Sequence, residues 1–344
     1  MKKKLLALIM CVVMVMSVLP VYAFAEDGLS DWTYNVLSEE EKTAEITGYN
    51  GTDTELLFPE EINGYRMVAI ADEAFCGASY YDYPITRIYV PDTYKRIGDA
   101  NFRYYRNLME VNLPHGLEYI GYMAFYRSGI FFENEHKCEL RNELPVLYIG
   151  EYCVIAEESF SHDRIIYTIK PGTKLIASGA FAGMTDLIGI IIPEGVEYIN
   201  HAAFADCNHI VSYVIPSTVK EIGHFALMSS DYGVYIKIPP TVTNIADDAI
   251  GGIGRKSLIY GEKGSSAEPF ANACGAEFIE IGDIVYGDVD SDGVVTLSDY
   301  ATSKSYVVGE SKFDGNAEIV GDMNSDCVID AFDLFEVDKA VNGI

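Results

Sequence analysis

Twelve residues near the C-terminus have the composition and spacing of a calcium-binding loop. Counting from Asp288, oxygen-bearing side chains stand at loop positions 1, 3, 5, 9 and 12, and Gly293 stands at position 6. Ca²⁺ takes roughly six to eight oxygen ligands, and alternate residues of a tight loop can direct such oxygens inward. A glycine in the middle permits the backbone bend that the loop needs. The spacing therefore predicts a site for one calcium ion.

The same spacing recurs 34 residues later, where Asp322 begins a second loop. An acidic, solvated linker is the alternative, but such a linker does not place small and aliphatic residues at fixed offsets twice. The second loop differs at position 6, where Cys327 replaces glycine. A non-glycine residue in the left-handed conformation costs about 1 kcal/mol. We therefore expect the second loop to bind calcium more weakly than the first.

A helix is expected after each loop, and none before the first. Residues 300–308 have a helical pattern that ends at Gly309, and residues 334–341 have one that ends near Gly343. The stretch 280–287 is too rich in glycine and too short to form an entering helix. Position 12 of both loops is aspartate, not the longer glutamate of an EF-hand. The pattern is thus a loop–helix unit repeated twice.

This doubled unit, over residues 283–344, resembles the dockerin family, whose members bind cohesin modules on the scaffoldin proteins of bacterial cellulosomes. The resemblance implies a cohesin partner and two bound Ca²⁺ ions. The ligands that it implies are the side chains of Asp288, Asp290, Asp292, Asp299, Asp322, Asn324, Asp326 and Asp333, the carbonyls of Val294 and Val328, and Thr296 and Asp330 through water.

In type I dockerins the cohesin contacts centre on positions 10 and 11 of each loop. The matching residues in this sequence are Leu297 with Ser298 and Ala331 with Phe332. The two pairs differ in size and polarity, so the near-symmetry that lets some dockerins bind either way round is broken. We therefore expect one preferred orientation on cohesin.

The larger part of the chain repeats itself with a period of about 23 residues. Pro193, Pro216 and Pro239 are each 23 residues apart, and so are Pro91 and Pro114. A fixed period in this range indicates a solenoid. Apolar residues stand one and three places before each proline position, which predicts a short strand with one face inward. Each unit has too small a core alone and needs neighbours on both sides.

The repeat motif Ile-x-Ile-Pro-x-x-Val-x-x-Ile-Gly-x-x-Ala-Phe is represented by residues 113–125. It resembles the BspA-like leucine-rich repeat family, and the resemblance covers about residues 33–280. It implies short parallel strands stacked in coils. We expect an N-terminal cap strand pair at 32–58 and a strand–helix–strand cap at 259–280. Residues 126–169 interrupt the period, and we expect a protruding hairpin around 131–153.

These features predict an α+β chain of three parts. Residues 1–25 have the lysine-rich start, apolar core and Ala-Phe-Ala end of a secretory signal peptide. Residues 26–280 form the leucine-rich-repeat solenoid, with an insertion near 126–160, and residues 281–344 form the small helical dockerin domain. We expect a secreted, extracellular, cellulosome-associated protein without membrane insertion, because no later apolar run could span a bilayer.

Charge and cysteine content narrow the functional classes further. The formal net charge of −28 at pH 7 opposes binding to nucleic acid. Six cysteines remain after the signal peptide, and an even number in an exported protein invites a disulfide interpretation. The spacings form no framework, so we favour buried free thiols. Cys138 with Cys153 is the pair that a disulfide would most plausibly join.

Outward strand positions of the repeats form a second candidate binding site. Its middle is unusually apolar for a solvent-facing surface, which is typical of a partner site. Cross-strand pairing that only stabilises the sheet is the alternative. The residues of this predicted repeat face are Tyr89, Asn112, Ile166, Thr168, Ile191, Val214, Tyr235 and Lys237.

Catalytic chemistry has little support in the sequence. The six histidines have no metal-ligand spacing, and no nucleophile stands in a motif with a positioned base. We therefore expect a non-catalytic cellulosome component that serves polysaccharide breakdown. Its repeat domain binds a protein or a plant cell-wall or cell-surface target. The alternative is a cellulosomal enzyme or enzyme inhibitor whose site lies in the insertion.

Overall fold

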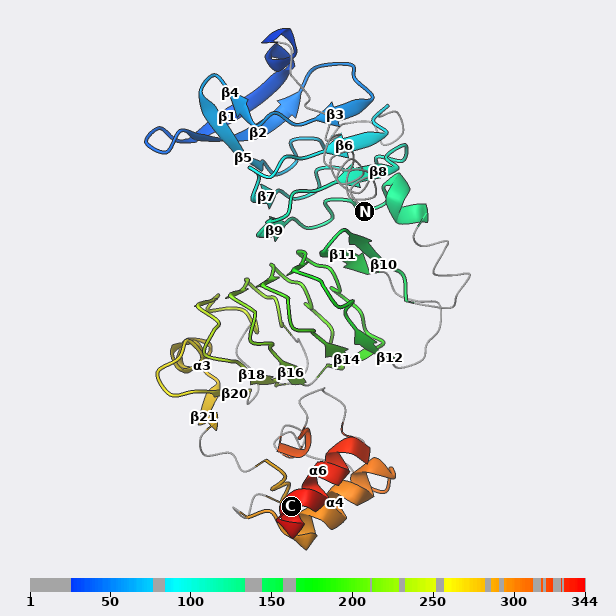
Figure 1. Cartoon of the computed structure of the whole chain (residues 1–344), viewed down its shortest axis with the longest axis vertical. Helices are drawn as coiled ribbons and strands as arrows, with labels where there is room; N and C mark the ends of the chain where they lie inside the picture. The colour runs from blue at the N-terminus through cyan, green and yellow to red at the C-terminus, as the bar shows by residue number, and fades with distance from the viewer. Residues whose placement is uncertain are drawn as a thin grey trace, which may run out of the picture.

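The computed structural model describes residues 26–76, 84–133, 144–156, 165–210, 212–228, 233–251, 257–281, 286–290, 294–311, 317, 320–323, 329 and 331–343. Within them the chain forms a β-solenoid followed by a pair of helices (Figure 1). The predicted α+β fold class is confirmed. The signal-peptide prediction for residues 1–25 lies outside the described residues.

The solenoid has short strands throughout. Its first half contains η1 (Glu26–Asp31), β1 (Trp32–Ser38), β2 (Thr43–Tyr49), β3 (Glu55–Leu57), β4 (Glu61–Ile62), β5 (Tyr65–Ile70), β6 (Arg87–Tyr89), β7 (Arg96–Ile97), β8 (Glu110–Asn112) and β9 (Tyr119–Ile120). Its second half contains β10 (Val146–Ile149), β11 (Tyr152–Ala156), β12 (Ile165–Thr168), β13 (Leu175–Ile176), β14 (Leu187–Ile191), β15 (Tyr198–Ile199), β16 (Ser212–Val214), β17 (Glu221–Ile222), β18 (Tyr235–Lys237), β19 (Asn244–Ile245), β20 (Leu258–Gly261) and β21 (Glu277–Glu280). The α-helices that lie wholly within the described residues are α3 (Ala267–Cys274), α4 (Leu297–Val307) and α6 (Ala331–Asn342).

Two series of parallel strands run along the solenoid. One series consists of the strands before each proline position, in the orders β3-β6-β8, β12-β14 and β16-β18-β20-β21. The other consists of the strands after it, in the orders β5-β7-β9 and β11-β13-β15-β17-β19. Residues one period apart are partners, as Ile97 is with Ile120 and Ile236 with Ile259. Each coil of the solenoid therefore contains about 23 residues, as the sequence period predicted.

The core lies between these two series. The apolar residues before each proline point inward, as Ile88 and Val90 do at 0% and 1% exposure. Aromatic rings fill the far wall and stack from coil to coil, with the Phe102 and Phe125 ring centroids 5.3 Å apart. Full burial of each such side chain contributes about 1.5–3 kcal/mol. Each coil therefore depends on its neighbours for stability.

The predicted protruding hairpin around residues 131–153 includes residues 134–143, which lie outside the described residues. Residues 129–133 are helical, and the hairpin that the structure describes is formed by β10 and β11 at residues 146–156, later than predicted. It does not protrude, because β11 pairs in parallel with β13 and continues the stack. Cys153 is buried at the inward strand position that Ile176 and Ile199 hold in the next coils, and Tyr152 is buried at the neighbouring position, which the exposed Glu221 holds on β17. Leu147 stands six residues before Cys153, where Pro193 stands six residues before Ile199.

The elements expected at the two ends of the solenoid are present. β1 and β2 form an antiparallel pair at the N-terminal end, and β20, α3 and β21 follow in order at the C-terminal end. Cys153 and Cys207 are buried free thiols, as favoured, whereas free Cys76 is exposed because it follows the buried Phe75 at the surface. Cys138, the other half of the disulfide alternative, lies outside the described residues.

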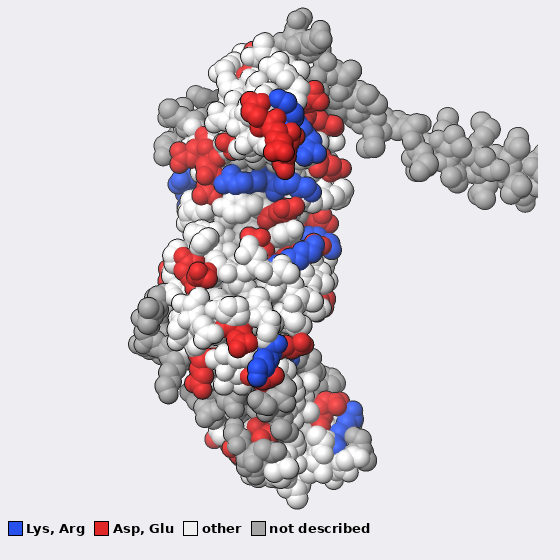
Figure 2. Space-filling model, turned by 90° about the vertical axis from the view of Figure 1, so that its left-hand side faces the viewer, with Lys and Arg blue, Asp and Glu red and all other residues white. Residues whose placement is uncertain are grey.

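Ion pairs join neighbouring coils on the surface. The guanidinium of Arg87 lies 2.7 Å from Glu110, and that of Arg96 lies 2.6 Å from Asp72. Figure 2 shows such basic side chains as bands across one face of the solenoid, with acidic side chains beside them. Each exposed pair contributes at most about 1 kcal/mol, so the core holds the coils together. Among the described residues, no helix combines the length and apolar character that a membrane crossing requires.

Candidate calcium loops and binding faces

Three carboxylates of the first predicted loop converge at the start of α4. One oxygen from each of Asp288, Asp290 and Asp299 lies within 4.8 Å of the other two. Asp299 is fully buried and Asp288 is 7% exposed. Like charges held this close repel, and a hard divalent cation converts that repulsion into binding. The donor set therefore fits calcium. Asp292, the next predicted ligand, lies outside the described residues.

The loop and the helix are held together by a capping box. The backbone N–H and side-chain hydroxyl of Thr296 donate to Asp299 at 2.8 and 3.1 Å, and the hydroxyl accepts the N–H of Ser298 at 3.1 Å. The N–H of Asp290 donates to the other oxygen of Asp299 at 3.2 Å. Asp299 thus connects the first turn of the helix to the loop. Val294, whose carbonyl is a predicted ligand, has a side chain that is 58% exposed.

The second loop repeats part of this arrangement. Asp322 and Asp333 are 6% and 1% exposed, and Asp333 accepts the backbone N–H of Met323 at 2.8 Å. Asp333 therefore ties the start of α6 to its loop, as Asp299 does for α4. The other predicted ligands of this loop lie outside the described residues: Asn324, Asp326, Val328 and Asp330.

Both helices begin three residues earlier than the pattern predicted, at loop position 10. The predicted cohesin contacts are therefore helical residues. Leu297 is 71% exposed, and Ser298 and Ala331 are also exposed. The side chain of Phe332 lies outside the described residues. Phe335, which was not predicted, adds a 57% exposed ring one helical turn after Ala331.

The predicted repeat face is divided among three sheets. Tyr89 pairs with Asn112 between β6 and β8, Thr168 pairs with Ile191 between β12 and β14, and Val214 pairs with Lys237 between β16 and β18. Ile166 is 46% exposed, whereas Ile191, Val214, Tyr235 and Lys237 are half-buried. The apolar middle of the face therefore centres on Ile166.

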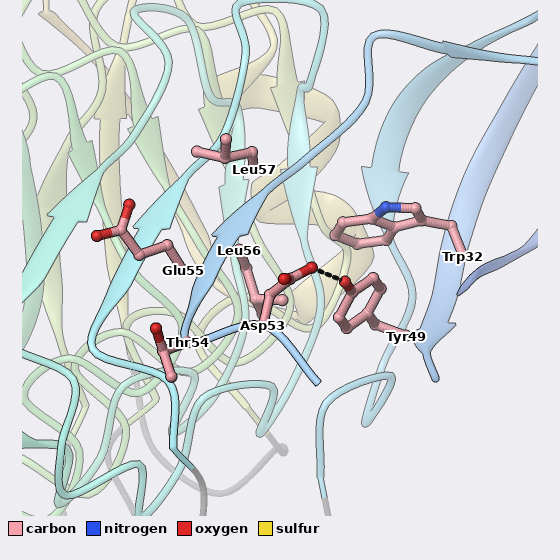
Figure 3. Close-up of a pocket in the computed structure, with 7 residues that line it drawn as sticks. All are labelled: Trp32, Tyr49, Asp53, Thr54, Glu55, Leu56 and Leu57. Atoms are coloured by element: carbon pink, nitrogen blue, oxygen red, sulfur yellow. Dashed lines mark hydrogen bonds between the residues drawn. The ribbon is translucent and has the colours of Figure 1, made fainter. Parts of the chain in front are cut away.

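Sequence reasoning missed a contact and two hollows. The ammonium of Lys237, at the end of the repeat face, lies 4.8 Å from the ring centroid of Tyr286. A hollow of about 280 Å³ lies beside the hairpin, where basic and acidic side chains alternate. A second hollow, of about 350 Å³, lies at the N-terminal cap beside Trp32 and Tyr49 (Figure 3). The only sequence signal for it was the single tryptophan of the chain near an acidic loop.

The family comparisons agree with these two parts. A model of the BspA type leucine rich repeat region matches in six copies over residues 69–154 and 153–268. The match covers more than half of the chain, which therefore belongs to the BspA-type leucine-rich repeat family. A dockerin type I domain matches residues 286–342.

The two family matches indicate the general functions of these parts. Dockerin type I domains bind calcium and dock to cohesins of the cellulosome type, and leucine-rich repeats mediate protein interaction. Both families are non-catalytic, and both are typical of extracellular or cell-surface proteins.

Solved structures with similarity to this chain come from several bacteria. A leucine rich repeat protein of T. pallidum is 17% identical, with 73% of this chain and 96% of that chain covered and a TM-score of 0.32. A leucine rich cell surface protein of Faecalibacterium prausnitzii A2-165 is 20% identical, with coverages of 69% and 76% and a TM-score of 0.30. A leucine-rich repeat protein of Bacteroides ovatus ATCC 8483 is 20% identical, with coverages of 77% and 68% and a TM-score of 0.31. No curated protein matches the chain significantly.

Proposed function

We propose that this chain is a secreted, non-catalytic component of a cellulosome. In this proposal residues 1–25 direct export, residues 26–280 present a binding surface, and residues 281–344 attach the chain to a scaffoldin cohesin. The observation that carries the proposal is the convergence of Asp288, Asp290 and Asp299 at the start of α4, within the region that matches the dockerin type I model.

The attachment domain holds two calcium ions in this proposal. The convergence of three carboxylates and the burial of Asp322 and Asp333 support one ion in each loop. When bound, calcium neutralises the loop carboxylates, which lets the two helices pack beside each other. The remaining ligands in the proposal are Asp292, Val294 and Thr296 in the first loop, and Asn324, Asp326, Val328 and Asp330 in the second.

Removing one ligand from each loop tests the attachment. Asp288→Ala combined with Asp322→Ala should abolish binding to a panel of purified cohesins and lower the helical circular dichroism signal together. Excess chelator should do the same to the unaltered chain. Asp338→Asn, on α6 and outside both loops, is the matched control and should keep both properties. Undiminished cohesin binding in excess chelator would contradict the proposal.

The cohesin contact is proposed to use Leu297, Ser298, Ala331 and Phe332 in one orientation. The exposure of Leu297 supports it, because an apolar side chain at a helix start gains free energy when a partner covers it. Leu297→Asp and Ala331→Asp should weaken cohesin binding unequally. The dissociation constants of the two variants should differ by about tenfold, which corresponds to about 1.4 kcal/mol of binding free energy. Equal losses in calorimetric titrations would mean that both orientations are used.

The repeat domain is proposed to bind a protein or a plant cell-wall or cell-surface target through its repeat face. The exposed Ile166 supports this choice. The unaltered chain is first tested for binding to a panel of purified wall polysaccharides and secreted proteins. Ile166→Glu should then reduce binding to whichever of them the unaltered chain binds. Val36→Glu is the control, since Val36 is an apolar strand residue on β1 with a similar exposure of 41%. Equal effects of the two substitutions would remove the repeat face from the proposal.

A further inference from the structure

The hollow at the N-terminal cap combines aromatic, apolar and acidic groups. It is lined by Trp32, Tyr49, Asp53, Thr54, Glu55, Leu56 and Leu57. Its volume of about 350 Å³ is at the small end of the range of roughly 300–1,000 Å³ that ligand pockets occupy. The hollow can therefore take one or two small rings and no large cofactor.

The aromatic wall is rigid. The rings of Trp32 and Tyr49 have centroids 4.6 Å apart, and Trp32 packs against Phe58 at 4.8 Å. Trp32 is 7% exposed, so the core holds its orientation, while Tyr49 is half-buried and presents more of its ring. The hydroxyl of Tyr49 donates to Asp53, which further restricts the ring (Figure 3). A flat ligand face would meet this wall with little loss of side-chain entropy.

Oxygen acceptors line the hollow beside the aromatic wall. Asp53, Thr54 and Glu55 are exposed; the first two lie in the loop before β3, and Glu55 is its first residue. Figure 3 shows Asp53 directed toward Tyr49, with Thr54 and Glu55 displaced toward the far side. A carboxylate accepts hydrogen bonds from neutral hydroxyls, and such charge-assisted bonds are roughly twice as strong as neutral ones.

The charges around Glu55 disfavour a cationic ligand. Arg87 lies 3.5 Å from Glu55 and 2.7 Å from Glu110, so the carboxylate of Glu55 already has a guanidinium as its partner. An ammonium group would be repelled by Arg87, whereas a hydroxyl can accept from it and donate to Glu55. A neutral ring with one apolar face and several hydroxyls matches both sides of the hollow.

We propose that the N-terminal cap hollow binds a sugar unit of a neutral polysaccharide. The C–H face of the sugar stacks against Tyr49, and its hydroxyls donate to Asp53 and Glu55. This site is separate from the dockerin loops, and it adjoins the N-terminal end of the repeat face, where Leu57 pairs with Tyr89. It gives the chain a carbohydrate contact that depends neither on the dockerin loops nor on Ile166.

The chain contains one tryptophan, and it lines this hollow, so its fluorescence reports the site directly. Titration of the full chain with cellotetraose, xylotetraose and mannotetraose should give a saturable change in tryptophan emission with at least one of them. Asp53→Asn should weaken that binding about tenfold, because it removes the charge from the acceptor. Tyr49→Ala should abolish it, and Tyr49→Phe, which keeps the ring, should retain part of it.

Glu221→Gln, an exposed acid on β17, is the matched control and should bind the sugar as the unaltered chain does. No response to any of the three sugars overturns the proposal, and so does an unchanged response in Asp53→Asn and Tyr49→Ala. A response to tetramethylammonium in place of the sugars assigns the hollow to cations and also overturns it. Cohesin binding is measured on the same samples, so failure of this site is distinguished from failure of the attachment.

Discussion

Asn200 accepts the backbone N–H of Ile120 through its side-chain oxygen at 3.1 Å, although 80 residues separate the two in sequence. Its side-chain N–H₂ donates to the carbonyl of Glu118 at 3.0 Å. In regular coils the backbone groups of one strand bond the next strand, as β7 does with β9. The amide of Asn200 therefore replaces a backbone partner at the point where the insertion interrupts the repeats.

Asn200→Ala should destabilise the solenoid. The substitution leaves the buried Ile120 N–H and the Glu118 carbonyl without this partner, at a cost of about 1–3 kcal/mol. Urea unfolding of the full chain in saturating calcium measures the change. Asn112→Ala, an exposed asparagine on β8, is the control and should change the free energy of unfolding by less than about 0.5 kcal/mol. Equal midpoints for the two variants would show that the junction is held elsewhere.

Gly121→Ala should be poorly tolerated, because a Cβ there would lie 2.4 Å from backbone atoms of Gly98 and Asp99. Adjacent coils approach closely at this corner, so we expect a loss of about 2 kcal/mol or more. Gly189→Ala is the matched control, since its Cβ would meet only Ile166 side-chain atoms at 3.4 Å or more. Thermal unfolding of both variants provides the comparison, and a larger loss in the Gly189 variant would contradict the expectation.

Asp299→Asn removes the charge of Asp299 and one of its two acceptor oxygens. The amide oxygen can still accept from Thr296, so the start of α4 should persist at saturating calcium, whereas the N–H of Asp290, which donates to the other oxygen, loses its acceptor. Calcium affinity should fall by about tenfold or more, because one carboxylate of the cluster is lost. Calorimetric calcium titration with parallel circular dichroism checks both statements. Asp338→Asn serves again as the control. If the Asp299 variant binds calcium as tightly as this control does, Asp299 is excluded as a ligand.

The buried thiols should resist alkylation in the native chain. Burial raises the pKa of both Cys153 and Cys207 to about 12, and the thiolate is the reactive form. Between about pH 7 and pH 9 both groups therefore stay protonated as well as covered. Iodoacetamide labelling followed by mass spectrometry should modify exposed Cys76 first and these two only after unfolding in urea. Rapid native labelling of Cys153 would mean that its coil opens.

The repeat architecture could be predicted because one signal recurs in most of the coils. The prolines mark where a strand ends, and the apolar residues before them, such as Ile88 and Val90, are inward-facing. The junction could not be predicted in the same way. β11 lacks the proline, and it has Cys153 at the inward position where the next coils have isoleucine, so it does not resemble a repeat strand although it occupies the place of one. The bonds made by Asn200 depend on how far the insertion displaces the chain, which periodicity does not encode.

The loop spacing predicted which residues would lie near each other at the first calcium loop, and Asp288, Asp290 and Asp299 do lie together. Their role as ligands stays a prediction. The hollow at the N-terminal cap could not be predicted, because Trp32 and Asp53 are brought together through Tyr49 of β2, which packs against the one and donates to the other. A lone tryptophan beside acidic residues is too weak a signal without that geometry.

The solenoid separates the N-terminal cap from the helices α4 and α6, which lie at opposite ends of the long axis (Figure 1). The contact of Tyr286 with Lys237 joins the helical end to the last coils. When the helices are bound to a partner, the solenoid therefore acts as a spacer that holds the N-terminal cap, with the hollow beside Trp32, away from the attachment point. Adding or deleting one coil would change the reach of that spacer without altering either end.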